Sequence, residues 1–283
     1  MVQTELIQKT ELQQVQEQLS DILETVIGIC ERCEIDYSMA FGSCLGAVRH
    51  QDFIPWDDDI DLYIPYSQLA EFKNCCMREL PKDYFYQDME TDPNYFLIYP
   101  KIRKTSTTSM NEKDRDIPMH WGIGIDIFPL FDVDSPNVAK KARRKVKILR
   151  RLGYMPYYAI KKQGIYQKGM TFFYRMIGRK TKNRWCKKML DGFQKMGGRY
   201  YMDIEEIENC RRIYPKEWFS DLSKCPFGAL SVRVMNGYDE YLSQVYGSDY
   251  MVVPKEGSAN HYTHENVIID CEQSYQNYLT EKE

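Results

Sequence analysis

The segment from residue 41 to 65, FGSCLGAVRHQDFIPWDDDIDLYIP, constrains the fold more than any other part of the chain. Its end alternates acidic and apolar residues, and in an extended strand side chains two positions apart point to the same face. Asp59 and Asp61 are therefore predicted to lie side by side, with Ile60 and Leu62 packed behind them. Two neighbouring carboxylates repel each other unless a cation lies between them, and such hard oxygen ligands suit Mg²⁺ or Mn²⁺.

A third carboxylate is expected from a neighbouring strand. Asp126 stands alone between two isoleucines, where an unpaired buried acid would be costly. Asp59, Asp61 and Asp126 are thus the predicted catalytic and metal-binding residues. Taken alone, the acidic run is also compatible with a solvated acidic turn. A calcium-binding EF-hand loop is excluded, because Leu62 and Gln68 stand where that loop requires Gly and Glu.

Candidate phosphate-binding groups lie on both sides of the acidic run. Gly42 and Ser43 predict a small-residue turn after a short buried strand, where backbone N–H groups and a hydroxyl can approach a phosphate. The basic side chains that can neutralise phosphate charge are Arg49, His50, Lys101, Arg103 and Lys104. The order of small-residue turn, acid-apolar-acid strand and later lone acid matches the pattern of nucleotidyltransferase-fold enzymes.

Helical and strand patterns alternate up to about residue 131. Apolar residues three and four apart predict an amphipathic helix over 11–32 and another over 66–80. A short strand that runs into a turn is predicted at 36–43, and further strands are predicted at 59–65, 83–89, 95–105 and 121–131. We expect an α/β (α+β) fold in which helices flank a mixed, nucleotidyltransferase-like sheet. The predicted divisions are a core at 1–135, a basic helical lobe or insertion at 136–200, and a C-terminal segment at 201–283 that packs back on the core.

Charge is distributed very unevenly along the chain. The formal net charge is 38 − 41 = −3, but residues 140–199 hold twenty Lys and Arg against the single acid Asp191, so this segment is +19 and the remainder is −22. Two basic helices are predicted, at 137–152 and about 170–197, with 161–169 as the connection between them. Aromatic residues interleaved with cations in the second helix are typical of peripheral membrane contact. The alternative is a helical lobe that packs on the core and leaves its cations in solvent.

The compartment is predicted from the start of the chain and from its cysteines. The first residues contain no apolar signal region, and no stretch approaches eighteen consecutive apolar residues. The nine cysteines form no regular framework and are expected to be reduced thiols, which favours a cytoplasmic location, with peripheral attachment to the inner face of the membrane left open. Cys30 and Cys33 form a CxxC inside a helical pattern, without the further ligands of a zinc site.

Four segments carry a resemblance to a known family. GSCLGAVRHQDFIPWDDDIDL (42–62) resembles the signature of the LicD-type phosphocholine transferases, and YPKIRKTSTT (99–108), GIDIFPLFDVD (124–134) and YGSDYMVVPKEGSANHY (246–262) resemble its later motifs. The family has a nucleotidyltransferase-like fold. It includes bacterial enzymes that move phosphocholine from CDP-choline to glycans and fukutin-related proteins that move ribitol phosphate from CDP-ribitol.

The resemblance also implies roles for individual residues. Asp59, Asp61 and Asp126 would hold Mg²⁺. The residues that it implies for substrate binding are Arg49 and His50 near the phosphates, Lys101 and Arg103 as further positive charge, and His261 close to the site. Two positions depart from the family pattern: Ser43 replaces the usual Thr and keeps its hydroxyl, whereas Ser258 stands where the family carries Arg.

The sequence thus predicts a Mg²⁺-dependent transferase of a substituted phosphate. Its donor would be CDP-choline or a related CDP compound, and its acceptor a hydroxyl of a cell-surface glycan, such as teichoic acid or lipopolysaccharide, or of its lipid-linked precursor. Choline is a quaternary ammonium that aromatic faces bind, and Trp56 and Trp121, which flank the acidic segments, are candidate contacts, with Trp56 selected for the site. Nucleotidyl transfer from a nucleoside triphosphate and non-enzymatic polyanion binding are the alternatives. No nucleic-acid partner is expected, because no recognised module appears.

Overall fold

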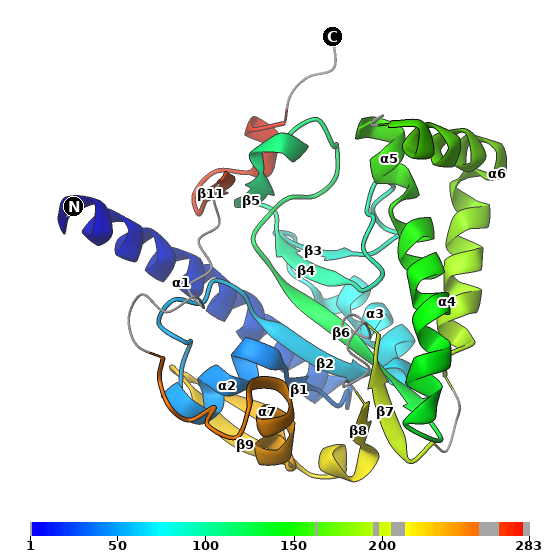
Figure 1. The fold of residues 1–283 in the computed structure, drawn as a ribbon. Coiled ribbons are helices and arrows are strands. Elements are labelled where there is room, and N and C mark those ends of the chain that lie inside the picture. Colours follow the sequence, from blue (N-terminus) through cyan, green and yellow to red (C-terminus); the bar gives the residue numbers. More distant parts are fainter. Residues whose placement is uncertain (1, 162–163, 195–197, 205–212, 255–265, 280–283) are drawn as a thin grey trace.

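The computed structural model describes residues 2–161, 164–194, 198–204, 213–254 and 266–279 (Figure 1). Its main sheet has the strand order β1-β2-β6-β4-β3, and β7 continues from β6 to β8. The strands are β1 (Ser38–Met39), β2 (Asp61–Pro65), β3 (Tyr84–Gln87), β4 (Lys101–Lys104), β6 (Gly124–Val133), β7 (Tyr200–Asp203) and β8 (Ile213–Pro215). β2 and β6 are parallel, and the other neighbours are antiparallel. The predicted mixed α/β fold is confirmed.

Two helices pack against one face of this sheet. α1 (Val2–Arg32) and α3 (Tyr66–Glu79) contact β2, β4 and β6. Leu62 and Ile125, the neighbours of Asp61 and Asp126 along their strands, are fully buried in the core of the sheet. α3 has the bounds predicted for it to within one residue. α1 begins nine residues earlier than expected, because its helical pattern continues through a polar N-terminal stretch.

A third group of elements lies next to β1. It consists of α2 (Phe41–His50), α7 (Tyr238–Tyr246) and a hairpin of β9 (Leu222–Phe227) and β10 (Leu230–Met235). The short strand predicted within 36–43 is present as β1, but the turn predicted after it is wrong, because Gly42 and Ser43 belong to the first turn of α2. This places both residues at a helix N-terminus.

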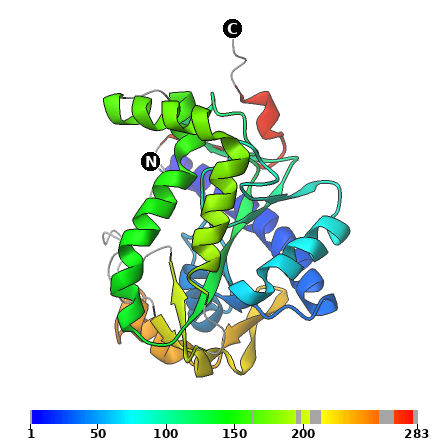
Figure 2. The same cartoon turned by 90° about the vertical axis from the view of Figure 1, so that its right-hand side faces the viewer.

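The basic segment forms a helical lobe between β6 and β7. It consists of α4 (Asn137–Gly153), α5 (Met155–Lys161) and α6 (Gly164–Asp191), and Figure 2 shows the second half of α6 running beside α4. The lobe has a core in which Val146, Leu149 and Cys186 pack with Phe131 and Met202 of the sheet. None of the described helices is long and apolar enough to cross a membrane.

The connection expected at 161–169 is shorter in the structure, because Lys161 still belongs to α5 and residues 164–169 already belong to α6. Helix α6 already begins at Gly164, and its interruption lies at Gly178, which has a left-handed φ of 73°. In the C-terminal region β11 (Val267–Asp270) pairs with β5 (Thr108–Asn111). Within the described ranges, short 3-10 helices lie at Glu112–Asp114, Lys216–Phe219 and Tyr275–Asn277.

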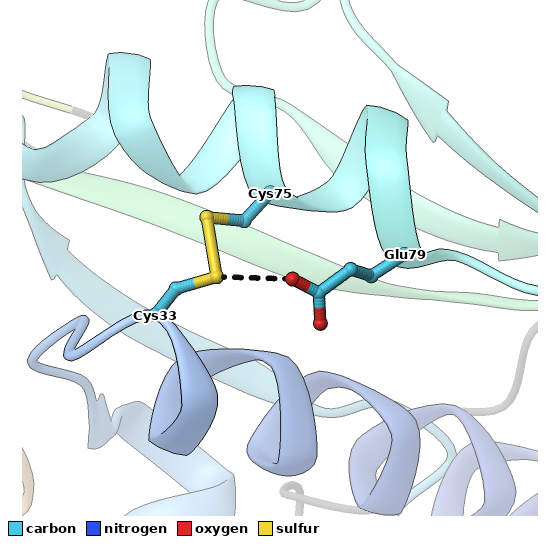
Figure 3. Close-up of side chains that lie close together, drawn as sticks. All are labelled: Cys33, Cys75 and Glu79. Carbon is cyan, nitrogen blue, oxygen red and sulfur yellow. Dashed lines mark hydrogen bonds between the residues drawn. A yellow bond between two sulfur atoms is a disulfide. The ribbon is translucent and has the colours of Figure 1, made fainter.

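A disulfide joins α1 to α3 and corrects the prediction that all cysteines are reduced. Cys33, directly after α1, is bonded to Cys75 of α3, and Glu79 Oε1 lies 3.4 Å from Cys33 Sγ (Figure 3). Arg78 Nη2 lies 3.4 Å from both sulfur atoms, and Arg32 Nε donates to the Glu79 carboxylate at 2.8 Å. Because two guanidinium groups accompany the bridge, the cluster favours a disulfide over a bound cation.

Reduction of this bridge is expected to destabilise the protein. Cys33 and Cys75 are 42 residues apart, and closing a loop of this size typically stabilises a fold by about 2–4 kcal/mol through the unfolded state. Dithiothreitol should therefore lower the free energy of unfolding of the wild type by about 2–4 kcal/mol, measured by urea denaturation. The double variant Cys33→Ser/Cys75→Ser should respond to reductant by much less. An unfolding midpoint that reductant leaves unchanged in the wild type would contradict a stabilising bridge.

Candidate active site

Three neighbouring strands bring two acids and a lysine into one row. In the sheet register Asp61 of β2 lies opposite Asp126 of β6, and Asp126 lies opposite Lys101 of β4. Since residues in register point to the same face, the three side chains converge on one face of the sheet. Lys101 Nζ contacts Asp126 Oδ1 at 2.5 Å, and both side chains are largely shielded from solvent.

The backbone around Asp61 is fixed by the start of α2. Ser43 is buried, and its hydroxyl oxygen accepts the Asp61 N–H at 2.9 Å, while the Asp61 carbonyl accepts the Ala40 N–H at 2.9 Å. A Cβ added to Gly42 would lie 2.7 Å from Asp57 Oδ2, so the glycine allows this carboxylate to approach the first turn of the helix. In the structure Gly42 and Ser43 therefore position the acidic segment, and their predicted contact with a phosphate stays a prediction.

Three carboxylates of the acidic run, those of Asp57, Asp59 and Asp61, hold their protons unusually tightly. Loss of hydration and the charges of Asp59 and Asp58 raise the pKa of Asp57 to about 8. Loss of hydration and the charge of Asp126 raise the pKa of Asp59 to about 6, and Asp57 and Asp59 share a hydrogen bond. Burial, with Asp59 and Asp126 nearby, raises the pKa of Asp61 well above its usual range. Ionising these side chains together is therefore unfavourable, and a cation beside them would stabilise their ionised forms.

The donor set of Asp59, Asp61 and Asp126 suits a hard divalent cation in its chemistry. All three donors are carboxylate oxygens, which Mg²⁺ prefers, and Lys101 already supplies one positive charge to them. The three carboxylates do not all bring an oxygen within 4.8 Å of one another. Within the described ranges, only the ligand atoms of Cys33, Cys75 and Glu79 lie that close together. The predicted Mg²⁺ site therefore fits by residue type and by mutual repulsion, and it stays a prediction.

Arg49 and His50 lie at the other end of α2. They are separated from Gly42 by about 10 Å along the helix, given its rise per residue. Arg49 donates to His50 Nε2 at 2.9 Å and to the Tyr250 carbonyl at 2.7 Å, so it fastens the 250–252 segment to α2. Loss of hydration and Arg49 lower the pKa of His50, and the rings of His50 and Trp56 are 6.5 Å apart. Their predicted roles in substrate binding stay predictions.

Arg103 is held in a buried network rather than beside the acids. Its guanidinium donates to Gln87 Oε1 and, at 2.5 Å, to the Gly122 carbonyl, and Gln87 in turn donates to Asp92 and to the His120 carbonyl. Burial lowers the pKa of Arg103 below its usual value. These contacts fix β3 to β4 and thereby support Lys101, two residues earlier on the same strand. Direct contact of Arg103 with substrate stays a prediction.

Comparison with known proteins gives the relationships of the chain. Residues 34–147 match the model of the LicD/FKTN/FKRP nucleotidyltransferase domain. Over 261 residues the chain is 30% identical to the lipopolysaccharide cholinephosphotransferase LicD of Haemophilus influenzae. The aligned residues are 88% of this chain and 95% of the relative. The chain belongs to the LicD family. The human and mouse ribitol 5-phosphate transferases FKRP are 42% identical to it over 57 residues, which are 20% of this chain and 11% of theirs.

The matched region includes every described site residue, and it ends within α4. Asp59, Asp61, Lys101 and Asp126 all fall between residues 34 and 147, so the LicD-family domain and the acidic site coincide. His261, the remaining predicted substrate residue, lies outside the residues that the structure describes.

Two groups near the site were not selected from the sequence. Asp57 hydrogen-bonds to Asp59, and the sequence signal for it was only its place in the acidic run. Tyr99 lies next to the charged row, with Lys101 Nζ 5.9 Å from its ring centroid and the Phe128 ring 4.5 Å away. In the sequence, Tyr99 is marked only by its position two residues before Lys101, the first residue of β4. Tyr99 also lines a cavity of about 650 Å³ between α3 and α6. Asp59, Asp61 and Asp126 do not line this cavity.

The network that supports β4 is expected to weaken in acid. His120 Nδ1 accepts the Gly122 N–H and its ring stacks on Phe85 at 4.9 Å, and burial together with Arg103 lowers the pKa of His120 to about 3. A depressed histidine pKa gives stability that is present above the unfolded value of about 6.5 and lost as the pH falls below it.

Lowering the pH from 7 to 5 should therefore remove about 2 kcal/mol of unfolding free energy through this group. The variant His120→Asn, measured by urea denaturation at both pH values, should lose about 2 kcal/mol less than the wild type over the same interval. Equal losses in the two proteins would contradict the neutral, buried state of His120.

Proposed function

We propose that this chain is a transferase that moves phosphocholine from CDP-choline to a hydroxyl of a glycan acceptor and releases CMP. The observation that carries the proposal is the register of Asp61, Asp126 and Lys101 across three strands of a LicD-family domain. The relative that matches along almost its whole length is a lipopolysaccharide cholinephosphotransferase, which favours choline as the head group and a lipopolysaccharide-type acceptor.

The residues of the chain would divide the reaction between them. The acceptor oxygen attacks the phosphorus that bears choline, the bond from that phosphorus to the CMP oxygen breaks, and CMP leaves with the bonding electrons. The ammonium of Lys101, which is paired with Asp126, would stabilise charge on the phosphate oxygens. A carboxylate of the cluster, for which the sequence favours Asp126, would take the hydroxyl proton. Mg²⁺, held by Asp59, Asp61 and Asp126, would supply further charge neutralisation.

Positioning accounts for much of the proposed catalysis. Ser43 fixes the backbone of Asp61, the Arg103 network fixes β4, and Tyr99 offers an aromatic face near Lys101 for a quaternary ammonium. A CDP donor related to CDP-choline remains compatible with the same phosphate chemistry. The cytoplasmic location stays a prediction.

The alternatives differ in what leaves the site. Nucleotidyl transfer from a nucleoside triphosphate would release pyrophosphate, whereas the proposed reaction releases CMP. A protein that only binds polyanions would release neither. Chromatography of the products from CDP-choline and from CTP, each with Mg²⁺ and an acceptor glycan, separates the three functions.

Removing the charge of Asp61 should abolish transfer and stabilise the fold. The pKa of Asp61 is raised in the folded state, so ionisation at pH 7 opposes folding, and Asp61→Asn removes that cost. We expect activity to fall at least about hundredfold, as for loss of a central electrostatic group, and the melting temperature without added metal to rise by roughly 2 °C. The exposed control Asp221→Asn should change neither. Near-normal turnover in Asp61→Asn would overturn the assignment.

Donor binding tests the head group. With Mg²⁺ present, CDP-choline should raise the melting temperature more than CDP-ethanolamine, CDP-glycerol or CDP-ribitol do. A ligand at a hundred times its dissociation constant stabilises the native state by about 2.7 kcal/mol, which thermal shift readily detects. The Asp61→Asn variant provides the matched comparison for metal dependence. Absence of stabilisation by every CDP compound would reject the proposed donor class.

A further inference from the structure

The first half of α6 carries large apolar side chains that the described chain does not cover. Ile165 is 91% exposed, Met176 70% and Phe172 67%, and the rings of Tyr166 and Phe173 are also exposed. These five residues are called the apolar face of α6. Single exposed apolar residues are ordinary on protein surfaces, but a contiguous group usually marks an interaction site.

Helical geometry places the five residues on one side. Ile165, Phe172 and Met176 are seven and four residues apart, and at about 100° per residue they fall within a narrow stripe. Tyr166 and Phe173, also seven apart, form the neighbouring stripe. The apolar face is therefore a continuous surface about two stripes wide rather than a set of scattered residues.

The opposite side of the same helix is used for packing inside the lobe. Thr171 is buried, and its hydroxyl donates to the Tyr158 carbonyl of α5 at 3.1 Å. Packing against α5 thus occupies the inner side of the helix. In Figure 2 this half of α6 turns away across the top of the lobe.

The interruption at Gly178 extends the apolar face across both halves of α6. In a straight helix Phe173 and Trp185 would lie about 18 Å apart along the axis. At Gly178 the chain turns, and the two ring centroids are 6.1 Å apart. A Cβ at Gly178 would meet nothing within 4 Å, so its left-handed φ of 73°, not lack of space, favours glycine there.

Cations border the apolar face. Lys168 and Arg175 are exposed and seven residues apart, so they share a stripe next to Phe172, and Arg184 is exposed beside Trp185. Among the residues that the structure describes, no acidic side chain forms an ion pair with these three cations. The lobe's acid Asp191 is instead paired with Lys187.

We infer that the apolar face of α6 binds the surface of an anionic phospholipid bilayer. Ile165, Phe172 and Met176 would enter the headgroup and acyl boundary, Lys168 and Arg175 would contact lipid phosphates, and the amphipathic Trp185 ring suits the interface. The inference rests on the surface of the lobe and not on the transfer reaction. Attachment through α6 would hold the protein at the membrane surface, where a lipid-linked acceptor would lie.

Charge and side-chain type favour a bilayer over other occupants. A second copy of this chain on the same face would bring Lys168 and Arg175 against their own equivalents. Duplex nucleic acid would satisfy these cations, but it offers no apolar phase for Ile165 and Met176. An anionic bilayer supplies phosphates at the rim and hydrocarbon in the centre, and it matches both kinds of side chain.

Sedimentation with vesicles tests the inference on the full chain. The wild type should bind vesicles of phosphatidylcholine with about 30% phosphatidylglycerol much more tightly than phosphatidylcholine alone. The variant Lys168→Gln/Arg175→Gln should lower the partition coefficient on anionic vesicles about tenfold or more. The variant Ile165→Ser/Phe172→Ser/Met176→Ser should lower it at least tenfold at both low and high salt.

Matched controls distinguish this face from general charge and hydrophobicity. Lys82→Gln/Lys224→Gln removes two exposed lysines outside the lobe and should leave the partition coefficient within about twofold. Met77→Ser and Met176→Ser each change one exposed helical methionine, 63% and 70% exposed, and only the second should weaken binding. Circular dichroism verifies that every variant keeps its helical content.

Three results would overturn the inference. The first is a wild type that does not bind anionic vesicles. The second is binding that the apolar and charge variants leave unchanged. The third is self-association in analytical ultracentrifugation that the triple variant abolishes, which would assign the face to a second copy. Loss of transfer activity in Asp61→Asn with intact vesicle binding would separate the attachment surface from the proposed reaction.

Discussion

The pairing of β6 with three other strands is the constraint on which the rest of the structure depends. Its first half lies between β2 and β4, which aligns Asp61, Asp126 and Lys101, and its second half pairs with β7. If β2 paired with β6 one residue out of register, Asp61 would face the core and Leu62 would face the site. The full burial of Leu62, Ile125 and neighbouring apolar side chains fixes that register, so the hydrophobic core determines the geometry of the polar site.

The same arrangement makes the site costly to fold. Asp57, Asp59 and Asp61 all have raised pKa values because burial and like charges disfavour ionisation. The fold accommodates them with one ion pair from Lys101 and with backbone anchors such as the Ser43 hydroxyl, while the surrounding apolar core supplies the stability. Clusters of this kind are characteristic of sites that bind cations or phosphates, where function rather than stability selects the residues.

Sequence reasoning succeeded where a local period decides the outcome. The lone acid between two isoleucines predicted that Asp126 lies beside the acidic strand, and its register opposite Asp61 agrees with this. β2 begins at Asp61, so the strand face that the alternation predicted for Asp59 and Asp61 together stays a prediction. Sequence reasoning failed where distant segments meet: the Lys101–Asp126 register, the Cys33–Cys75 bridge and the Arg103–Gln87 contact all need the folded sheet. The turn at Gly178 inside α6 was not predicted, because the residues around it continue a helical pattern and only the folded backbone shows its left-handed φ.

The insertion point of the lobe links its surface to the site. The chain leaves the sheet at the end of β6 and returns in β7, which pairs with the same half of β6. Phe131 and Met202 of these two strands belong to the lobe's own core, so the lobe cannot move freely without disturbing the strand that carries Asp126. An enzyme attached to a bilayer through α6 would therefore present its acidic site in a fixed orientation to the membrane. That orientation would select among acceptors by their distance from the lipid surface, which free diffusion in solution would not do.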